Sequence, residues 1–319
     1  MKAIFCDKYG APTKVLQLKE MEKPIPGDKQ VLVKVATSSV NVADVAPIRG
    51  AFIARLFGTG LLRPKSERHG TDLAGRVEAV GKDVTGFKPG DEVFGAADGA
   101  FSEYVVAKED LLVQKPANIP FEEAGAVAIA ATSALQGLRA GRIQPGQKVL
   151  VYGASGAVGT FAVQLAKALG AEVTAVCSSR NVEQARALGA DHVIDYTQED
   201  VTRSGQKFDL ILAVNGAHSM AEYKRILNPT GTCVVVGGKM SQIFQGLLAG
   251  PVGSKKGDQR VGFMGIAKLN QKDMAYLRDL MESGKVKTVI DQRYPLAETG
   301  KAMEYIEAGH ARGKVVITV

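Results

Sequence analysis

The stretch that decides the fold is Lys148-Val-Leu-Val-Tyr-Gly153-Ala-Ser-Gly156-Ala-Val-Gly159. It is typical of a strand that leads through a glycine-rich turn into a helix, which we expect to run to Leu169 and to stop at Gly170. In such a unit one glycine permits the tight turn, one lets a pyrophosphate approach the backbone, and one lets the helix pack on the strand. Free amides at the helix start attract the anion. We therefore assign to a dinucleotide the residues Gly153, Ser155, Gly156, Ala157 and Val158.

Strand-like and helical segments alternate around this turn. Strands are expected at residues 149–152, 172–176, 192–194, 210–214 and 232–236. This alternation is typical of a parallel sheet covered by helices on both faces, and it predicts an α/β fold with a Rossmann doubly wound sheet. The spacing G-x-x-G-x-x-G departs from the commoner G-x-G-x-x-G. A tight turn in an unrelated α/β domain is therefore the alternative interpretation.

The first part of the chain has a different pattern. Short antiparallel strands separated by Gly and Pro turns are expected at residues 2–5, 30–36, 75–80, 92–94, 101–106 and 112–114. The composition changes near Pro120, where residues 121–140 become Ala- and Leu-rich with helical periodicity. Helices at 271–283 and 296–308 and a strand at 314–319 close the chain. We predict a β-rich domain at residues 1–120, a dinucleotide-binding domain at 121–265, and a C-terminal segment at 266–319 that partly returns to the first domain.

Composition narrows the class of protein. The 319 residues suit two domains, and 45% hydrophobic with 23% charged residues is typical of a globular protein. No apolar run is long enough for a membrane helix, and Met1 leads directly into a strand-like pattern, so we expect a cytoplasmic protein without a membrane partner. The net charge of +7 does not indicate nucleic acid, because Lys and Arg are dispersed and Trp is absent. The three dispersed cysteines indicate neither disulfides nor a Cys-rich metal site.

The end of the second parallel strand selects the cofactor. An NAD site usually has Asp or Glu there, but this chain reads Cys177-Ser-Ser-Arg180. Ser178, Ser179 and Arg180 offer hydroxyls and a guanidinium to a 2′-phosphate, so NADPH is favoured over NADH. A helix-capping serine followed by a solvated arginine is the alternative. Tyr196, after the third strand, would flank the adenine or its phosphate, or else is a surface tyrosine.

Further motifs extend over nearly the whole chain. They are Asn41-Val-Ala-Asp44, His69-Gly-Thr-Asp72-Leu-Ala-Gly75, Phe87-Lys-Pro-Gly90-Asp91, Gly99-Ala-Phe-Ser-Glu-Tyr104 and Gly309-His-Ala-Arg-Gly-Lys314. With them the sequence resembles the medium-chain dehydrogenase/reductase superfamily, in its zinc-independent, NADPH-linked quinone oxidoreductase-like branch. The resemblance implies a GroES-like catalytic domain at residues 1–120, a Rossmann NADP-binding domain at 121–265, and a homodimer.

The resemblance also indicates that no catalytic zinc is bound. Zinc-dependent relatives have a cysteine in place of Asn41, a histidine with an acid in place of Thr71-Asp72, and another cysteine near Ala130. His69 has no Cys or His partner at zinc spacing, so we interpret it as a structural or surface histidine. Alcohol oxidation needs a Lewis acid, whereas reduction of a quinone or conjugated carbonyl needs hydride positioning and polarisation of an oxygen. Reduction is therefore the expected chemistry.

The remaining site residues follow from the resemblance. Asn41 is expected near the nicotinamide ribose or the substrate as a hydrogen-bond donor, with an Asx-turn residue as the alternative. Arg49 is either an oxyanion partner or a solvated charge, and residues 52–68 are expected to form a substrate-side loop. No tyrosine follows Asn41 at the place where several relatives have one, so the proton donor stays open. Cofactor contacts are also expected from Thr132, Asn215, Gly237, Gly238 and Phe263, and Lys314 is expected to reach the phosphate side.

Three functions are consistent with the sequence. The first is a zinc-independent NADPH-dependent oxidoreductase that reduces quinones or related small conjugated carbonyls. The second, an alkenal/enone double-bond reductase, shares the same cofactor and metal-free hydride transfer. The third is of another class, an NADPH-binding accessory protein without turnover, and the missing tyrosine keeps it open.

Overall fold

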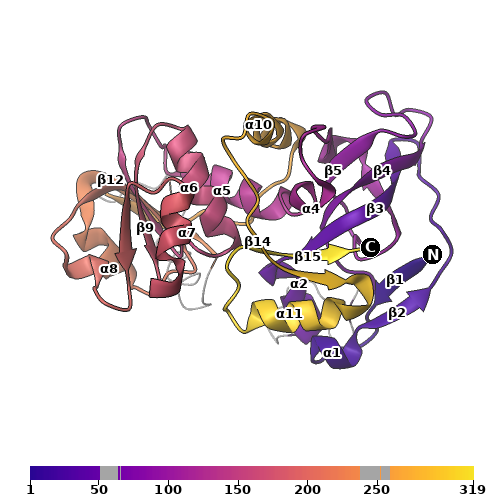
Figure 1. Cartoon of the computed structure of the whole chain (residues 1–319), viewed down its shortest axis with the longest axis horizontal. Helices are drawn as coiled ribbons and strands as arrows, with labels where there is room; N and C mark the ends of the chain where they lie inside the picture. The colour runs from indigo at the N-terminus through magenta and orange to yellow at the C-terminus, as the bar shows by residue number, and fades with distance from the viewer. Residues whose placement is uncertain (51–63, 65, 238–251, 253–258) are drawn as a thin grey trace. The chain divides into compact units, whose positions relative to one another are not determined.

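The computed structural model describes residues 1–50, 64, 66–237, 252 and 259–319. The chain forms two compact units. Unit 1 comprises Met1–Ile129, Leu269–Glu282 and Thr288–Val319, and unit 2 comprises Ala130–Lys268 and Ser283–Lys287. Figure 1 shows the elements of both units. None of the helices in these described ranges is long and apolar enough to cross a membrane.

Unit 2 is built on a parallel sheet of six strands, in the order β10-β9-β8-β11-β12-β13. The strands are β8 (Lys148–Tyr152), β9 (Glu172–Cys177), β10 (His192–Asp195), β11 (Phe208–Val214), β12 (Leu227–Val236) and β13 (Arg260–Phe263). Counted within the unit this order is 3-2-1-4-5-6, which is the order of the dinucleotide-binding fold. The predicted Rossmann sheet is confirmed.

Helices cover both faces of this sheet because each strand is apolar on both sides. On one face Tyr223 of α8 (Met220–Arg225) is fully buried against Ile211 and Cys233. On the other, α5 (Ala128–Ala140) approaches so closely that a Cβ on Gly137 would lie 2.8 Å from the side chain of Leu212. Two further helices of the unit are α6 (Ala157–Ala168) and α7 (Val182–Ala187). Short 3-10 turns complete it at η3 (Ser179–Asn181) and η4 (Val201–Arg203).

Unit 1 contains a seven-stranded sheet in the order β14-β15-β3-β4-β5-β7, with β6 also paired to β3. Its strands are β3 (Gln30–Val40), β4 (Asp72–Val80), β5 (Glu92–Ala96), β6 (Tyr104–Lys108), β7 (Leu112–Gln114), β14 (Ile290–Pro295) and β15 (Lys314–Thr318). A separate hairpin joins β1 (Lys2–Phe5) to β2 (Gln17–Glu20). The helices are α1 (Pro12–Val15), α2 (Val42–Arg49), α4 (Phe121–Ala124), α10 (Gln271–Glu282) and α11 (Thr299–Glu307), with 3-10 turns η2 (Glu109–Leu111) and η5 (Leu296–Glu298).

The division between the units differs from the predicted one at residue 120. The helix predicted over residues 121–140 is broken into α4 and α5 at Gly125, where a Cβ would meet the carbonyl of Thr37 at 2.7 Å. Because α4 packs on strands β3 and β4, unit 1 continues to Ile129. The C-terminal strand β15 pairs antiparallel with β3, so the end of the chain lies in unit 1.

Candidate cofactor site and active site

The glycine turn of unit 2 has the geometry that its sequence predicts. Gly153 has φ +79°, and a Cβ there would lie 2.0 Å from the carbonyl oxygen of Val214. A Cβ on Gly159 would lie 2.1 Å from the oxygen of Gly153, so the helix and strand are too close for any side chain. A Cβ on Gly156, by contrast, would find only one atom within 4 Å, at 3.8 Å. The backbone at Gly156 is thus open to a ligand, while the other two glycines are required by packing.

The start of α6 is suited to an anion. Gly156 is its N-cap and provides no side chain to bond the first amides, and the first turn carries no acidic residue. Ser155, Ala157 and Val158 flank this cap and are partly exposed. The N-terminal end of a twelve-residue helix carries partial positive charge and unpaired amide hydrogens. These residues fit the pyrophosphate of a dinucleotide.

A second cluster lies at the carboxyl ends of β9 and β10, and we name it the phosphate cluster: Ser178, Ser179, Arg180, Tyr196 and Thr197. The amide of Tyr196 donates to the carbonyl of Cys177 at 3.0 Å, which joins the two strand ends. The hydroxyls of Ser179 and Thr197 lie 2.9 Å apart. Arg180 and Tyr196 are both exposed. The structure therefore brings the four predicted residues of this cluster together.

Sequence reasoning missed Thr197 and Asp195 in this region. Asp195 accepts hydrogen bonds from the amide and hydroxyl of Thr197 at 3.0 and 2.8 Å. A hydrogen bond from Ser179, followed by those from Thr197, holds the pKa of Asp195 below its usual value. The carboxylate is thus charged at neutral pH and opposes a phosphate nearby, so the cation of Arg180 becomes the deciding group. An aspartate two residues before a threonine, as in Asp195-Tyr-Thr197, is typical of an Asx-turn. This pattern could have predicted that the side chain of Asp195 bonds to Thr197.

The other strands of the sheet end at predicted residues. Asn215 follows β11 with φ +52°, a left-handed conformation that is uncommon for a residue with a side chain. Gly237 follows β12 with φ +69°, and a Cβ there would meet no atom within 4 Å. Phe263 ends β13 and packs against the core beside Val235. These residues share the carboxyl edge of the sheet, where ligands of such folds bind.

Two predicted cofactor contacts are not found at this edge among the described residues. Thr132 is fully buried within α5 and does not belong to the strand edge. Gly238 lies outside the described residues, as does most of the predicted substrate-side loop at residues 52–68. The roles of these residues stay predictions.

Unit 1 contains a buried polar group that we name the Lys314 cluster: Ser39, Asn41, Asp72 and Lys314. The ammonium of Lys314 donates to Asn41 Oδ1 at 2.6 Å and to Asp72 Oδ2 at 3.1 Å. The same Asp72 oxygen accepts Asn41 Nδ2 at 3.1 Å and Ser39 Oγ at 2.6 Å. Asn41 and Asp72 lie where zinc-dependent relatives have metal ligands. In this chain the cation that these two side chains contact is the ammonium of Lys314. Asn41 also begins α2, where its amide donates to Asp44 Oδ2 at 2.7 Å.

The prediction that Lys314 reaches the phosphate side of the cofactor is wrong. Its side chain has no exposed surface and is ion-paired with Asp72. The reason is strand pairing, since β15 lies against β3 with Val315 opposite Val40 and thereby brings Lys314 to Asn41.

Arg49 lies in an ion pair at the end of α2. Its guanidinium donates to both carboxylate oxygens of Glu307, with Nε 2.8 Å from Oε1 and 3.1 Å from Oε2. This hydrogen-bonded ion pair raises the pKa of Arg49 and ties α2 to α11. The part of the guanidinium that faces Glu307 is thus engaged in an ion pair at the surface, and a role as oxyanion partner stays a prediction.

His69 is buried, and its Nε2 atom has no hydrogen-bond partner within the described part of the chain. Burial lowers its pKa, so the imidazole is neutral at physiological pH. Among the residues that the structure describes, no group of three or more His, Cys, Asp or Glu side chains could hold a metal ion.

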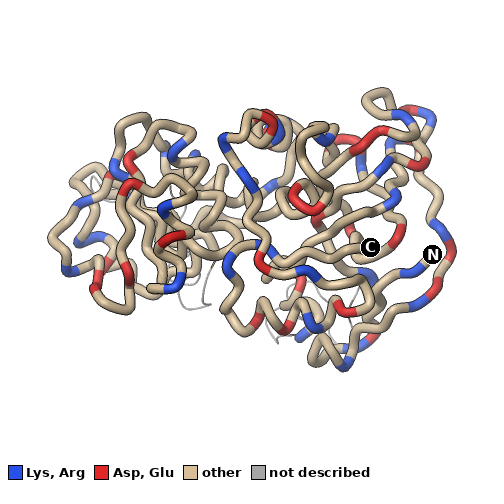
Figure 2. The backbone as a smooth tube through the Cα atoms, in the orientation of Figure 1, with Lys and Arg blue, Asp and Glu red and all other residues tan. Residues whose placement is uncertain are grey.

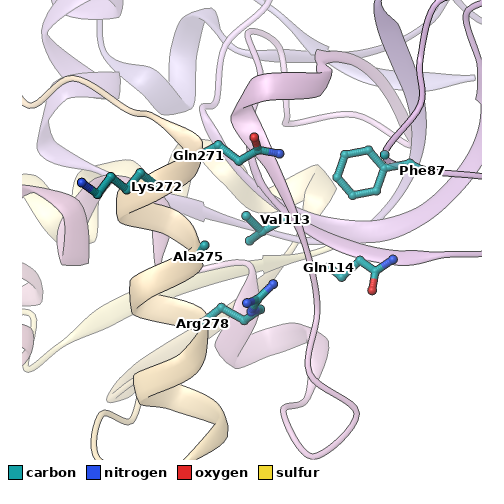
Figure 3. Close-up of a pocket in the computed structure, with 8 residues that line it drawn as sticks. Phe87, Val113, Gln114, Gln271, Lys272, Ala275 and Arg278 are labelled. Carbon is teal, nitrogen blue, oxygen red and sulfur yellow. The ribbon is translucent and has the colours of Figure 1, made fainter.

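Two cavities of the described residues lie apart from both clusters. One, of about 440 Å³, lies between α10 and the strand β7 in unit 1 (Figure 3). Phe87 and Val113 line it together with the polar ends of Gln114, Gln271 and Arg278. No residue predicted for the site lines this cavity.

Comparison with known proteins agrees with this architecture. Residues 27–117 match the alcohol dehydrogenase GroES-like domain, and residues 188–317 match the family described as zinc-binding dehydrogenase. The chain is 33% identical to the chloroplastic quinone-oxidoreductase QR1 of Triphysaria versicolor, over 99% of this chain and 98% of that protein. It is 31% identical to an NADPH-dependent alkenal/one oxidoreductase, chloroplastic, of Arabidopsis thaliana, over 99% of this chain and 79% of that protein.

A solved structure of Escherichia coli quinone oxidoreductase complexed with NADPH superposes with a TM-score of 0.81, at 26% identity and full coverage of both chains. The fold and the two sites define an oxidoreductase with a GroES-like and a Rossmann domain. The chain belongs to the medium-chain dehydrogenase/reductase superfamily, in its quinone oxidoreductase-like branch.

Proposed function

We propose that the chain is an NADPH-dependent reductase that transfers a hydride to quinones. The observation that carries the proposal is the phosphate cluster, in which serine hydroxyls and Arg180 gather where an NAD site would have an acid. The relative from Triphysaria and the structural relative from Escherichia coli, both named quinone oxidoreductases, support the substrate class.

Different residues of unit 2 would bind different parts of the cofactor. The open backbone at Gly156 and the amides that begin α6 would bind the pyrophosphate. Ser178, Ser179 and Arg180 would bind the 2′-phosphate, with Tyr196 beside the adenine. Asn215, Gly237 and Phe263, at the ends of β11, β12 and β13, would serve the nicotinamide half.

The chemistry requires little from the protein beyond positioning. Bound NADPH supplies the hydride. The amide of Asn41 would donate a hydrogen bond that orients the nicotinamide ribose or polarises the acceptor oxygen. We propose solvent as the proton source, because residues 45–52 contain no tyrosine and Arg49 is ion-paired with Glu307.

Reduction of conjugated alkenals and enones is the second candidate. The Arabidopsis relative, named an alkenal/one oxidoreductase, favours it. In both reactions the acceptor takes a hydride at an electron-poor position conjugated with a carbonyl, so both place the same demands on the cofactor site.

Steady-state consumption of NADPH tests the proposal. We expect turnover with 9,10-phenanthrenequinone and much slower turnover when NADH replaces NADPH. Turnover of an α,β-unsaturated ketone but of no quinone would establish the second candidate instead. NADPH binding without turnover of any acceptor would leave only an accessory protein.

The assembly and location of the protein stay predictions. We expect a homodimer, and light scattering of the purified chain checks it. We expect no binding of nucleic acid, since Lys and Arg are dispersed among Asp and Glu along both units (Figure 2). Cytoplasmic location is likewise a prediction, and the two relatives compared from plants are chloroplastic by name.

A further inference from the structure

The Lys314 cluster holds a lysine that is fully buried. Lysine is rarely buried unless its charge is paired, because removal of an ammonium from water is strongly unfavourable. Here Asp72 provides the opposite charge and is itself fully buried. The remaining carboxylate oxygen of Asp72 accepts the amide of Ile129 at 2.9 Å. The pair of Lys314 and Asp72 is thus buried and hydrogen-bonded. It also contacts Asn41, which is the hydrogen-bond donor in the proposed function.

Three neighbouring strands bring the cluster together. Ser39 lies opposite Asp72 where β3 pairs with β4, and Val40 lies opposite Val315 where β3 pairs with β15. Asn41 follows β3 directly and starts α2. The positions are therefore set by a continuous sheet and not by a loop.

The ammonium decides which way the amide of Asn41 points. Lysine only donates hydrogen bonds, so the atom 2.6 Å from its Nζ must be the amide oxygen. The amide nitrogen then faces Asp72, to which it donates one hydrogen at 3.1 Å. The other hydrogen has no partner within the part of the chain that the structure describes, and Asn41 retains a small exposed surface of 8%.

We propose that Lys314 is a positioning residue for Asn41. With Asp72 it clamps the amide at both ends, so that a single N–H is presented to the cofactor or acceptor and the amide cannot turn its oxygen outward. This inference rests on the proposed function, in which Asn41 is the donor. A reversed amide would present a lone pair and repel the oxygen that it should bind.

Lys314→Met is the direct test, because methionine keeps much of the apolar stem and removes the charge. Lys115→Met is the matched control: Lys115 has a side chain only 4% exposed, pairs with Glu92 at 2.9 Å, and lies outside the Lys314 cluster. Both variants are measured by thermal unfolding, by NADPH binding through fluorescence, and by kcat and KM.

We expect Lys314→Met to lower kcat/KM by roughly 10- to 100-fold at a temperature where it is fully folded, as misplaced reactive groups do. Lys115→Met should lose stability without that loss. Asn41→Ala should lower kcat/KM similarly, and the double variant Asn41→Ala/Lys314→Met should be no worse than Asn41→Ala alone. Equal kcat/KM for the folded Lys314 and Lys115 variants, or additive losses in the double variant, would overturn the inference.

A second measurement on the unaltered protein covers the case in which Lys314→Met fails to fold. The side-chain amide signals of Asn41, assigned with Asn41→Ala, are followed by NMR during titration with NADPH and acceptor. A ligand-induced shift of one of the two hydrogen signals, with the other left in place, supports a clamped amide. Equal shifts of both signals, or no shift with any ligand, contradict it. If the protein binds NADPH but reduces no acceptor, the proposed function fails while this measurement still decides the role of Lys314.

Discussion

The strand edge of unit 2 and the Lys314 cluster of unit 1 use polar groups in opposite ways. At the strand edge the ligand-binding groups are left open: a Cβ on Gly156 would meet no atom closer than 3.8 Å, and α6 lacks a side-chain cap. In the Lys314 cluster the polar side chains are hydrogen-bonded to one another. The difference indicates that the strand edge is suited to bind a ligand through its backbone, whereas the Lys314 cluster is suited to fix one donor through buried charge.

The largest effect is expected from removal of the carboxylate that pairs with Lys314. Asp72→Leu should lower the free energy of unfolding by about 3–5 kcal/mol, because it leaves a buried ammonium without its counter-charge. The double variant Asp72→Leu/Lys314→Met should recover part of that loss, and urea unfolding measures both. A loss below about 1 kcal/mol in the single variant would mean that the pair is not buried as the structure shows.

Two glycines with the same backbone conformation test how firmly packing fixes the turn at the strand edge of unit 2. Gly153 and Gly146 both have φ +79°, but only at Gly153 would a Cβ meet backbone, at 2.0 Å from Val214 O. Gly146→Ala should cost about 1 kcal/mol of stability through strain alone. Gly153→Ala should cost clearly more, about 2–4 kcal/mol, and weaken NADPH binding. Equal losses in urea unfolding would show that the turn can relax and is not fixed by packing.

A further effect concerns pH and Asp44, which lies beside the Lys314 cluster. Burial raises its pKa to about 6, the charge of Asp72 adds to the rise, and the bond from the Asn41 amide and the charge of Lys314 oppose it. The folded state then binds more protons than the unfolded state between the ordinary pKa of 3.8 and about 6. The stabilisation from this group is complete below that interval and is lost as the pH rises through it.

Asp44→Asn removes the titration and keeps an acceptor for the Asn41 amide. Relative to the unaltered protein, its free energy of unfolding should therefore rise with pH by up to about 1.4 kcal/mol per unit in this interval, and should be level above it. Chemical unfolding of both proteins at a series of pH values measures the difference. A difference that does not change with pH would show that Asp44 has an ordinary pKa.

The fold could be predicted from the sequence where the signal is local. The strand–turn–helix at Gly153 and the strand ends at Ser178, Asn215 and Gly237 each follow from a few adjacent residues. Strand β13 was not predicted, and neither was β14, since short strands carry little periodicity. The break between α4 and α5 depends on contact of Gly125 with β3, which no helical pattern contains.

The site residues, like the elements of the fold, could be predicted where the signal is local in the sequence. Ser178, Ser179 and Arg180, which follow β9 directly, were predicted. Asp195 and Thr197 were missed because the turn after β10 contacts the turn after β9 only in the folded chain. Lys314 and Asn41 lie 273 positions apart, and only the pairing of β15 with β3 joins them. Arg49 and Glu307 lie 258 positions apart in the same way. Errors thus arose where side chains meet across long separations.

The central claim is that Arg180 reads the 2′-phosphate of NADPH, and a comparison of cofactor affinities tests it most directly. Calorimetric titration of NADPH and NADH is carried out with the unaltered protein and with Arg180→Asp. Loss of one charge-assisted contact should weaken NADPH binding by about 1.5–3 kcal/mol, or roughly 10- to 150-fold, while NADH affinity stays nearly constant. If the variant binds NADPH as tightly as the unaltered protein does, the phosphate cluster is not the cofactor-selecting site.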